Sequence, residues 1–334
     1  MTAAAQPVTA GSPDAMDATR RAVRRNSWIL GLLAFLVVLL VFTKLIQPNY
    51  GPTGIQGLAV SAAALVLAAV AQAIVVISGG IDLSIGAMIA FTNVVAAQAM
   101  LTADDQTGVA IAIGVLLLGL LIGAVNGALI VMTRVADIIV TLAMSFVWAG
   151  CALLVLSVPG GRADTWLTSL ASGSVVSEWL PKPAFLVLLI IALIWIPLRR
   201  SRLGLSLYAI GSDQLAAFRS GVSVGRTKII SYALAGLFSA LAGLAVTANT
   251  GIGTPLPGGY TLTSVAAVVL GGVSLAGGRG GVVGPIIAVM ILALIRTDMT
   301  FLNLNSNLAT VTQGVILIVV VMFGSLAALR RRRA

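Results

Sequence analysis

The stretch that decides the fold is "GIQGLAVSAAALVLAAVAQAIVVISGGIDLSIGAMIAFTNVVAAQAM", residues 54–100, in which Asp82 is the one formal charge. Two apolar runs of about the length needed to cross a bilayer flank "GGIDLSIG", residues 79–86. A charge at the centre of a lipid-facing helix costs roughly 2.5–3.5 kcal/mol on insertion scales. Asp82 therefore either marks a point where the chain leaves the membrane or acts inside it.

The whole composition is that of an integral membrane protein. Of the 334 residues 59% are hydrophobic and 9% are charged, whereas a soluble domain carries about 25% charged residues. The apolar runs are continuous and do not alternate with polar residues, which favours helices over barrel strands. The 36 glycines suit close helix packing in lipid. The sequence predicts an all-α polytopic membrane protein.

The residue inventory excludes several kinds of chemistry. There is no His, and Cys151 is the single Cys, which excludes zinc sites, His relays, Cys/His catalysis and an intramolecular disulfide. The segment "GGRGG" (277–281) lacks the Lys-Ser/Thr of a phosphate-binding loop and is better interpreted as a tight turn. A Ser-Lys or paired-carboxylate hydrolase remains open by residue count, but no such cluster is visible. We expect no catalytic residue, no metal and no cofactor.

Ten spans are predicted, between a disordered tail (1–27) and a basic tail (330–334). The first span is interpreted as a retained helix because its apolar run is too long for a signal peptide. The expected spans cover residues 28–46, 56–78, 84–101, 108–132, 138–157, 183–198, 227–248, 261–276, 281–296 and 308–329.

The basic residues orient these spans. With both termini in the cytoplasm, sixteen of the twenty Lys and Arg residues fall inside and four fall outside. This asymmetry also explains the net charge of +10 better than a nucleic-acid partner does. The orientation places loops 158–182 and 249–260 outside and segment 199–226 inside, and it makes Trp166 and Trp179 interface anchors.

The predicted spans carry amides and hydroxyls where ion-coupled transporters generally carry ionisable groups. Such groups either hydrogen-bond between helices or line a path for a neutral, hydroxyl-rich solute. They are Gln72, Thr92, Asn93, Gln98, Asn126, Thr141 and Ser145, of which Gln72, Asn93, Asn126, Thr141 and Ser145 are the candidate path residues.

Two glycine phrases are expected on the cytoplasmic side. In "GGIDLSIG", Gly79 and Gly80 can take the positive φ that ends a helix, and Asp82 or Ser84 can cap the next helix. On this interpretation Asp82 is not a buried charge. The second phrase, "GGVSLAGG" (271–278), suggests a paired re-entry point near an inner gate. Its glycines are Gly271, Gly272, Gly277 and Gly278.

The inner segment contains "IGSDQLAAFRSG", residues 210–221, which predicts a short capped helix. Ser212 or Asp213 can cap its N-terminus and Gly221 can stop it. The helix is too short and too polar to span a bilayer. It is either an ordinary connector or an element that docks onto a cytoplasmic partner.

Four motifs occur in the same order in the permease subunits of ribose-type bacterial ATP-binding-cassette importers. They are "SGGIDLSIGA" (78–87), "VADIIVTLAM" (135–144), "GSDQLAAFRSGV" (211–222) and "AAVVLGGVSLAGGRGGVVGPIIA" (266–288). The chain resembles that family over roughly residues 55–325. It departs from the pattern at Asp213, where Asn is more usual, and at Ala288, which replaces a Gly.

The resemblance implies a permease in the bacterial inner membrane with no catalytic residue of its own. The implied partners are a second permease copy or paralogue, two cytoplasmic ATP-binding subunits and a periplasmic binding protein that delivers a monosaccharide or polyol. The residues implied to contact the ATP-binding subunit are Ser212, Asp213, Ala216, Ala217, Arg219, Ser220 and Gly221. The alternative is a self-sufficient facilitator or secondary transporter for a small neutral solute.

Overall fold

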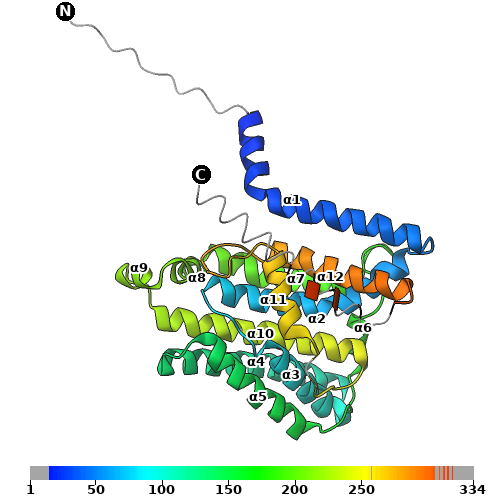
Figure 1. Cartoon of the computed structure of the whole chain (residues 1–334). Coiled ribbons are helices and arrows are strands. Elements are labelled where there is room, and N and C mark those ends of the chain that lie inside the picture. The colour runs from blue at the N-terminus through cyan, green and yellow to red at the C-terminus, as the bar shows by residue number, and fades with distance from the viewer. Residues whose placement is uncertain are drawn as a thin grey trace, which may run out of the picture.

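The computed structural model describes residues 15–256 and 258–304, with the isolated positions 308, 311, 312, 314, 315 and 318. Over these residues the regular structure is helical, apart from two isolated β-bridges (Figure 1). The elements are α1 (Ala15–Ile46), α2 (Pro52–Ile77), α3 (Ile85–Ala99), a 3₁₀ turn (Met100–Thr102), α4 (Asp105–Thr133), α5 (Asp137–Val155), α6 (Thr165–Leu170), α7 (Lys182–Arg200), α8 (Arg202–Ser212), α9 (Gln214–Arg219), α10 (Val224–Thr250), α11 (Tyr260–Leu270) and α12 (Val283–Phe301).

Eight of the described helices are long and apolar enough to cross a membrane, which confirms the all-α polytopic fold. They match the first seven predicted spans and the span at 281–296 to within a few residues. The tail prediction was wrong over residues 15–27, because α1 begins at Ala15. The sequence "AMDATRRAVRR" there is rich in good helix formers. The predicted span 308–329 lies outside the described residues except at six positions, and the tail 330–334 lies wholly outside them.

Helix α2 forms the centre of the bundle. It packs against α10, α12, α11 and α7, and Figure 1 shows α1 and α5 on opposite outer sides. Its sequence is apolar all round and rich in Ala, as expected for a helix that other helices surround. The main core cluster extends from α2 into α10, α11 and α12.

Close contact between α4 and α10 depends on glycine. A Cβ at Gly119 would collide with Gly236 O and with Ala240, and a Cβ at Gly123 would collide with Tyr232 O. The four-residue spacing of Gly119 and Gly123 lets the two backbones touch, which confirms the expected small-residue packing.

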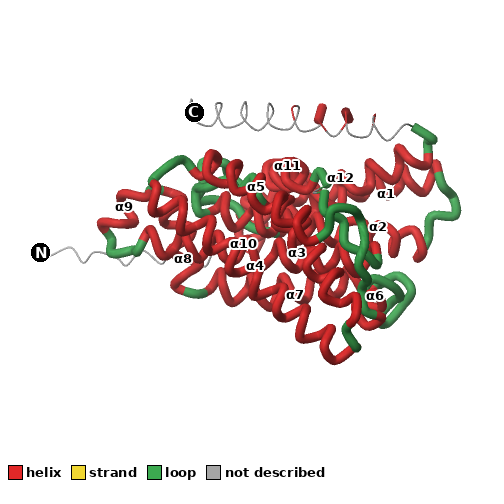
Figure 2. Tube along the Cα trace, turned by 90° about the horizontal axis from the view of Figure 1, so that it is seen from below, coloured by secondary structure: helices red, strands yellow, loops and turns green. Residues whose placement is uncertain are grey.

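The predicted span 261–276 was wrong. Helix α11 has only 11 residues and lies across the long helices, so that Figure 1 shows it from the side and Figure 2 shows it end-on. Contacts with α3 hold both the residues before α11 and its start: Thr254 N donates to Asn93 Oδ1 (2.6 Å), and Gly86 N donates to Thr261 Oγ1 (3.0 Å). The span was predicted because this region is apolar. The glycines at 258–259 and 271–272, however, limit the helix to three turns.

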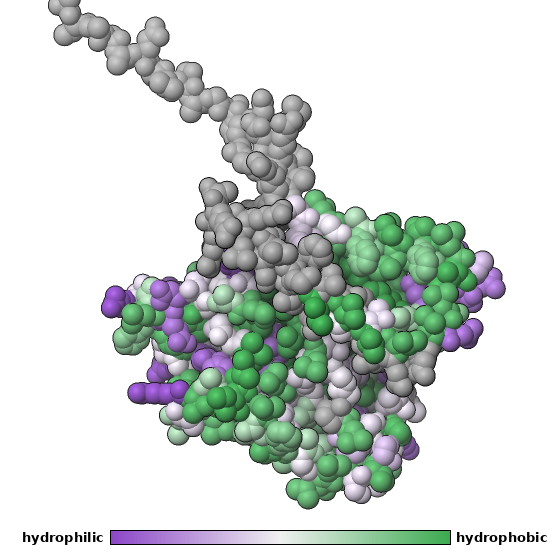
Figure 3. Space-filling view, in the orientation of Figure 1, coloured by the Kyte–Doolittle hydropathy of each residue, from purple (hydrophilic) through white to green (hydrophobic). Residues whose placement is uncertain are grey.

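The bundle has two distinct ends. The α9 end carries α8, α9 and both glycine turns, and the α6 end carries α6 and the loop before α7 (Figures 1 and 2). In Figure 3 the visible surface between the ends is mostly hydrophobic, with hydrophilic residues gathered largely toward the ends. This pattern agrees with the bundle axis crossing the membrane.

Candidate functional site

The break between α2 and α3 is the first part of the candidate site. Helix α2 ends at Ile77, and Gly79 takes a φ of +82° in the turn that follows, as predicted. Gly80 has no positive φ. It is instead a point of close approach, because a Cβ there would meet Asp137 Oδ2 and Tyr232 Oη.

Side chains from three helices hold this break inside the bundle. The Gln72 amide, oriented to satisfy both partners, donates to Asp82 O (2.9 Å) and accepts from Asp82 N (3.3 Å). Leu83 N donates to Thr141 Oγ1 at 3.1 Å. Asn126 Nδ2 donates to Ser84 Oγ at 2.8 Å. Gln72 and Thr141 thus satisfy backbone groups that the interrupted helix leaves without partners, and Asn126 holds the Ser84 side chain.

Asp82 lies just before Ser84, the N-cap residue of α3, and is fully buried, so the expectation that it lies unburied at the membrane surface was wrong. Its Oδ1 accepts from Ser84 N (2.8 Å) and Ser84 Oγ (2.6 Å), so it forms a local turn with the backbone two residues on. The expected helix cap was therefore wrong, because neither Asp82 nor Ser84 bonds an N–H group inside α3 through its side chain. Burial raises the pKa of the Asp82 carboxyl to about 6, although the Ser84 hydrogen bonds lower it. The break is buried because α4 and α5 pack over it.

The two glycine turns meet at Gly211, near the end of α8. Gly278 N donates to Ile77 O (2.9 Å), and a Cβ at Gly277 would lie 2.9 Å from Gly79 Cα. A Cβ at Gly211 would collide with Ile77 O. Gly272, Gly277 and Gly278 have positive φ, whereas Gly271 ends α11 with an ordinary negative φ. The predicted pair of turns thus forms one contact in which α8 takes part.

An ion pair lies directly beside this contact. Lys228 Nζ donates to Asp137 Oδ1 at 2.7 Å, and Tyr232 Oη donates to Asp137 Oδ2 at 2.8 Å. Both charged side chains are largely buried. The pair joins the start of α10, at its fifth residue, to the first residue of α5, next to Gly80.

The α8–α9 segment forms the tip of the α9 end. Asp213 Oδ1 accepts from Leu215 N and Ala216 N, both at 2.9 Å, and Gly221 has φ +85° beyond the last turn, so the predicted cap and stop are confirmed. Ser212 instead belongs to the last turn of α8.

The predicted contact residues divide by exposure. Ala217 is only 5% exposed and belongs to the buried side of α9. The other six predicted residues, Ser212, Asp213, Ala216, Arg219, Ser220 and Gly221, are exposed. Leu215 and Phe218 are 58% and 67% exposed, and the sequence prediction missed them. Their spacing of three residues on a short helix was the available signal.

The candidate path residues are mostly occupied by backbone groups. Gln72, Asn126 and Thr141 hold the break at Asp82 and Ser84, and Asn93 holds segment 252–254. All four are buried. Ser145 is half-buried and bonds Leu142 O in its own helix. Two roles were expected for these residues: hydrogen bonding between helices, or lining a path for a solute. These contacts match the first role.

Together, membrane-length helices, a buried polar break and a projecting helical tip describe a polytopic membrane protein. The family described as "Branched-chain amino acid transport system / permease component" matches residues 54–321, and the chain belongs to that family.

Curated relatives agree with this assignment. The ribose import permease protein RbsC of Escherichia coli K12 is 32% identical over 89% of this chain and 94% of its own length. RbsC of Bacillus subtilis is 33% identical over 88% and 91%. The autoinducer 2 import permease LsrD of Escherichia coli HS is 29% identical over 92% and 95%. No solved structure matches the chain.

Proposed function

We propose that this chain is the permease subunit of a bacterial ATP-binding-cassette importer for a monosaccharide or related polyol. A periplasmic binding protein delivers the solute, and two separate subunits hydrolyse ATP in the cytoplasm. The names of the relatives, which include ribose, D-allose and autoinducer 2 permeases, support this solute class. The same family and the distribution of Lys and Arg support an inner-membrane location and cytoplasmic termini for this subunit.

The observation that carries the proposal is the apolar tip of α9. Leu215 and Phe218 project from the α9 end, where the surface is otherwise rich in polar groups (Figure 3). Exposed apolar side chains rimmed by polar residues mark protein interaction sites. The Asp213 cap and the Gly221 turn hold these two side chains in place, and a groove on the ATP-hydrolysing subunit is their proposed partner.

The contacts between α9, α10 and α5 connect this tip mechanically to the break between α2 and α3. Gly221 lies between α9 and α10, and Lys228 near the start of α10 binds Asp137 beside Gly80. A displacement of α9 would therefore shift both α10 and the glycine turns. In the proposed mechanism the partner subunit moves when ATP drives it, and this movement displaces α9. The contacts of α9 and α10 then shift the break between α2 and α3.

The proposed solute path lies between this chain and a second permease copy or paralogue. The polar side chains inside the chain already bind its own backbone or one another, and the cavity at the α6 end is lined almost wholly by apolar side chains. Neither arrangement offers a sugar the hydrogen bonds that it loses on leaving water.

The test is uptake of radiolabelled ribose into proteoliposomes. We expect uptake only when ATP, a ribose-type ATP-hydrolysing subunit and a ribose-binding protein accompany the chain. Phe218→Ala should weaken assembly with the ATP-hydrolysing subunit. Gradient-driven uptake by the chain alone would establish the self-sufficient transporter instead.

A further inference from the structure

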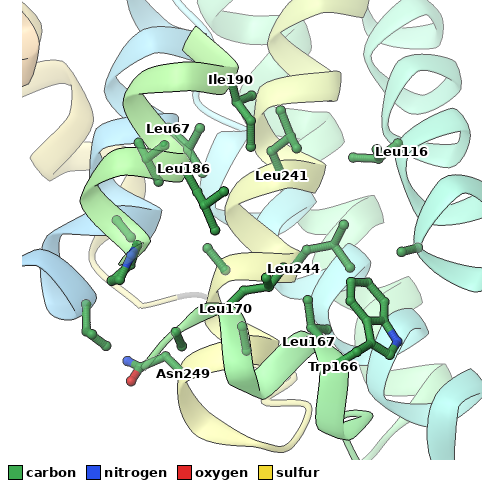
Figure 4. Close-up of a pocket in the computed structure, with 18 residues that line it drawn as sticks. Leu67, Leu116, Trp166, Leu167, Leu170, Leu186, Ile190, Leu241, Leu244 and Asn249 are labelled. Atoms are coloured by element: carbon green, nitrogen blue, oxygen red, sulfur yellow. The ribbon is translucent and has the colours of Figure 1, made fainter. Parts of the chain in front are cut away.

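A cavity of about 250 Å³ lies at the α6 end, between helices far apart in the sequence (Figure 4). Helix α10 forms its floor, α4 and α7 stand on either side, and α6 closes one end. Small side chains make the space, because Ala112, Ala245 and Ala248 lie where larger residues would fill it. The cavity has no part in the α9 end or the glycine turns.

The cavity reaches the lipid-facing side of the bundle. Leu116, Leu186 and Ile190 line it and are only partly buried. Their neighbours Leu117 and Leu189 are exposed apolar residues on the same two helices. In a bilayer, lipid lies against such surfaces, so the opening is in contact with acyl chains.

The two ends of the cavity differ in polarity. In Figure 4, Leu67, Leu241, Ile190 and Leu116 surround one end, and Asn249 lies at the other, beside α6. Lys182 precedes the lining residue Pro183, and its Nζ donates to Ser169 O (3.0 Å) in the last turn of α6. This bond uses one of the three donors of the ammonium group.

We propose that this cavity binds one acyl chain of a phospholipid from the leaflet at the α6 end, with the lipid phosphate on Lys182. An apolar chain fits the Leu- and Ala-lined body, and the phosphate complements the free donors and positive charge of Lys182 at the rim. The site is independent of the proposed transport function.

The lining argues against water or a polar solute as the occupant. A buried water needs two to four polar partners, and Asn249 is the polar side chain that faces the space apart from the Trp166 indole. Trp166, expected as an interface anchor, turns inward and forms part of the wall, whereas Trp179 is exposed.

The experiment is native mass spectrometry of the purified chain, counting retained phospholipid. Ala245→Phe fills the cavity, and Ala143→Phe makes the same change on the exposed side of α5 as a control. We expect retention to fall about tenfold in the first variant and to stay unchanged in the second. Lys182→Gln should also lower retention, whereas Arg296→Gln, at an exposed position near the end of α12, should not.

A second measurement covers the case in which Ala245→Phe folds poorly. Trp166 as the sole Trp, with the other four replaced by Phe, should be quenched by phospholipid with brominated acyl chains, and Lys182→Gln should reduce that quenching. Equal retention in Ala245→Phe and wild type would overturn the proposal. So would loss of a chain dimer without loss of phospholipid, because a second protein copy would then fill the cavity.

Discussion

Lys228 Nζ and Asp137 Oδ1 lie 2.7 Å apart, although 91 residues separate them in the chain. The contact ties the start of α10, which follows the α9 tip, to the start of α5, which covers the break. Tyr232 holds the other carboxylate oxygen of Asp137. The pair therefore lies between α9 and the break, so a displacement of α9 would be transmitted to the start of α5 through it.

Breaking this pair should impair transport more than assembly. Asp137→Asn and Lys228→Met each leave a largely buried partner without its counter-charge, at an expected cost on the order of 1–3 kcal/mol. In reconstituted importers we expect uptake to fall about tenfold or more while ATP hydrolysis continues. The exchanged variant Asp137→Lys/Lys228→Asp should recover part of the uptake, and a wholly additive double-mutant cycle would contradict coupling between the two residues.

Asp82 should make the stability of the protein depend on pH. Its carboxyl has a folded-state pKa of about 6, above the ordinary 3.8, so between these values the folded state binds more protons than the unfolded state. Its contribution to stability therefore falls as the pH rises through this window. Asp82→Asn should become more stable relative to wild type from pH 5 to pH 8, by about 1–3 kcal/mol, in thermal unfolding in detergent.

Glu178→Gln, at an exposed loop position, is the matched control for Asp82→Asn and should show no such trend. A stability difference between Asp82→Asn and wild type that does not change with pH would mean that the carboxyl titrates outside this window.

Phe218 should contribute strongly to binding of the ATP-hydrolysing subunit. Large exposed side chains at the centre of an interface often cost 2 kcal/mol or more when truncated, which is roughly 30-fold in affinity. Phe218→Ala should show that loss in titration binding assays. Leu205→Ala, an equally exposed apolar position on α8, serves as the control, and equal losses in both variants would argue against α9 as the specific contact.

Gly211 should tolerate no side chain. A Cβ there collides with Ile77 O and lies 2.6 Å from Gly278 N, so Gly211→Ala would push the two glycine turns apart. We expect a destabilisation of about 2 kcal/mol or more, measured as a lower thermal midpoint in detergent. Gly281→Ala adds the same methyl group where no atom lies within 4 Å, and it should leave the midpoint nearly unchanged.

The sequence predicted those elements that depend only on residues close together in the chain. Continuous apolar runs defined eight of the helices, and the side-chain chemistry of Asp213 and Gly221 predicted the ends of α9. The burial of Asp82 could not be predicted in this way, because it depends on Asn126 and Thr141 packing over the break from other helices. The Lys228–Asp137 pair was invisible for the same reason, since neither residue belongs to a motif that names the other.

The crosswise placement of α11 has a consequence for how the protein is made. A lipid environment cannot satisfy backbone groups outside a helix, and Asn93 and Gly86 of α3 provide contacts for Thr254 and for Thr261 at the start of α11. An 11-residue helix is also too short to be integrated as an independent span. We therefore expect the region that contains α11 to enter the membrane only after α3 is in place, so that during biosynthesis its insertion depends on an earlier part of the chain.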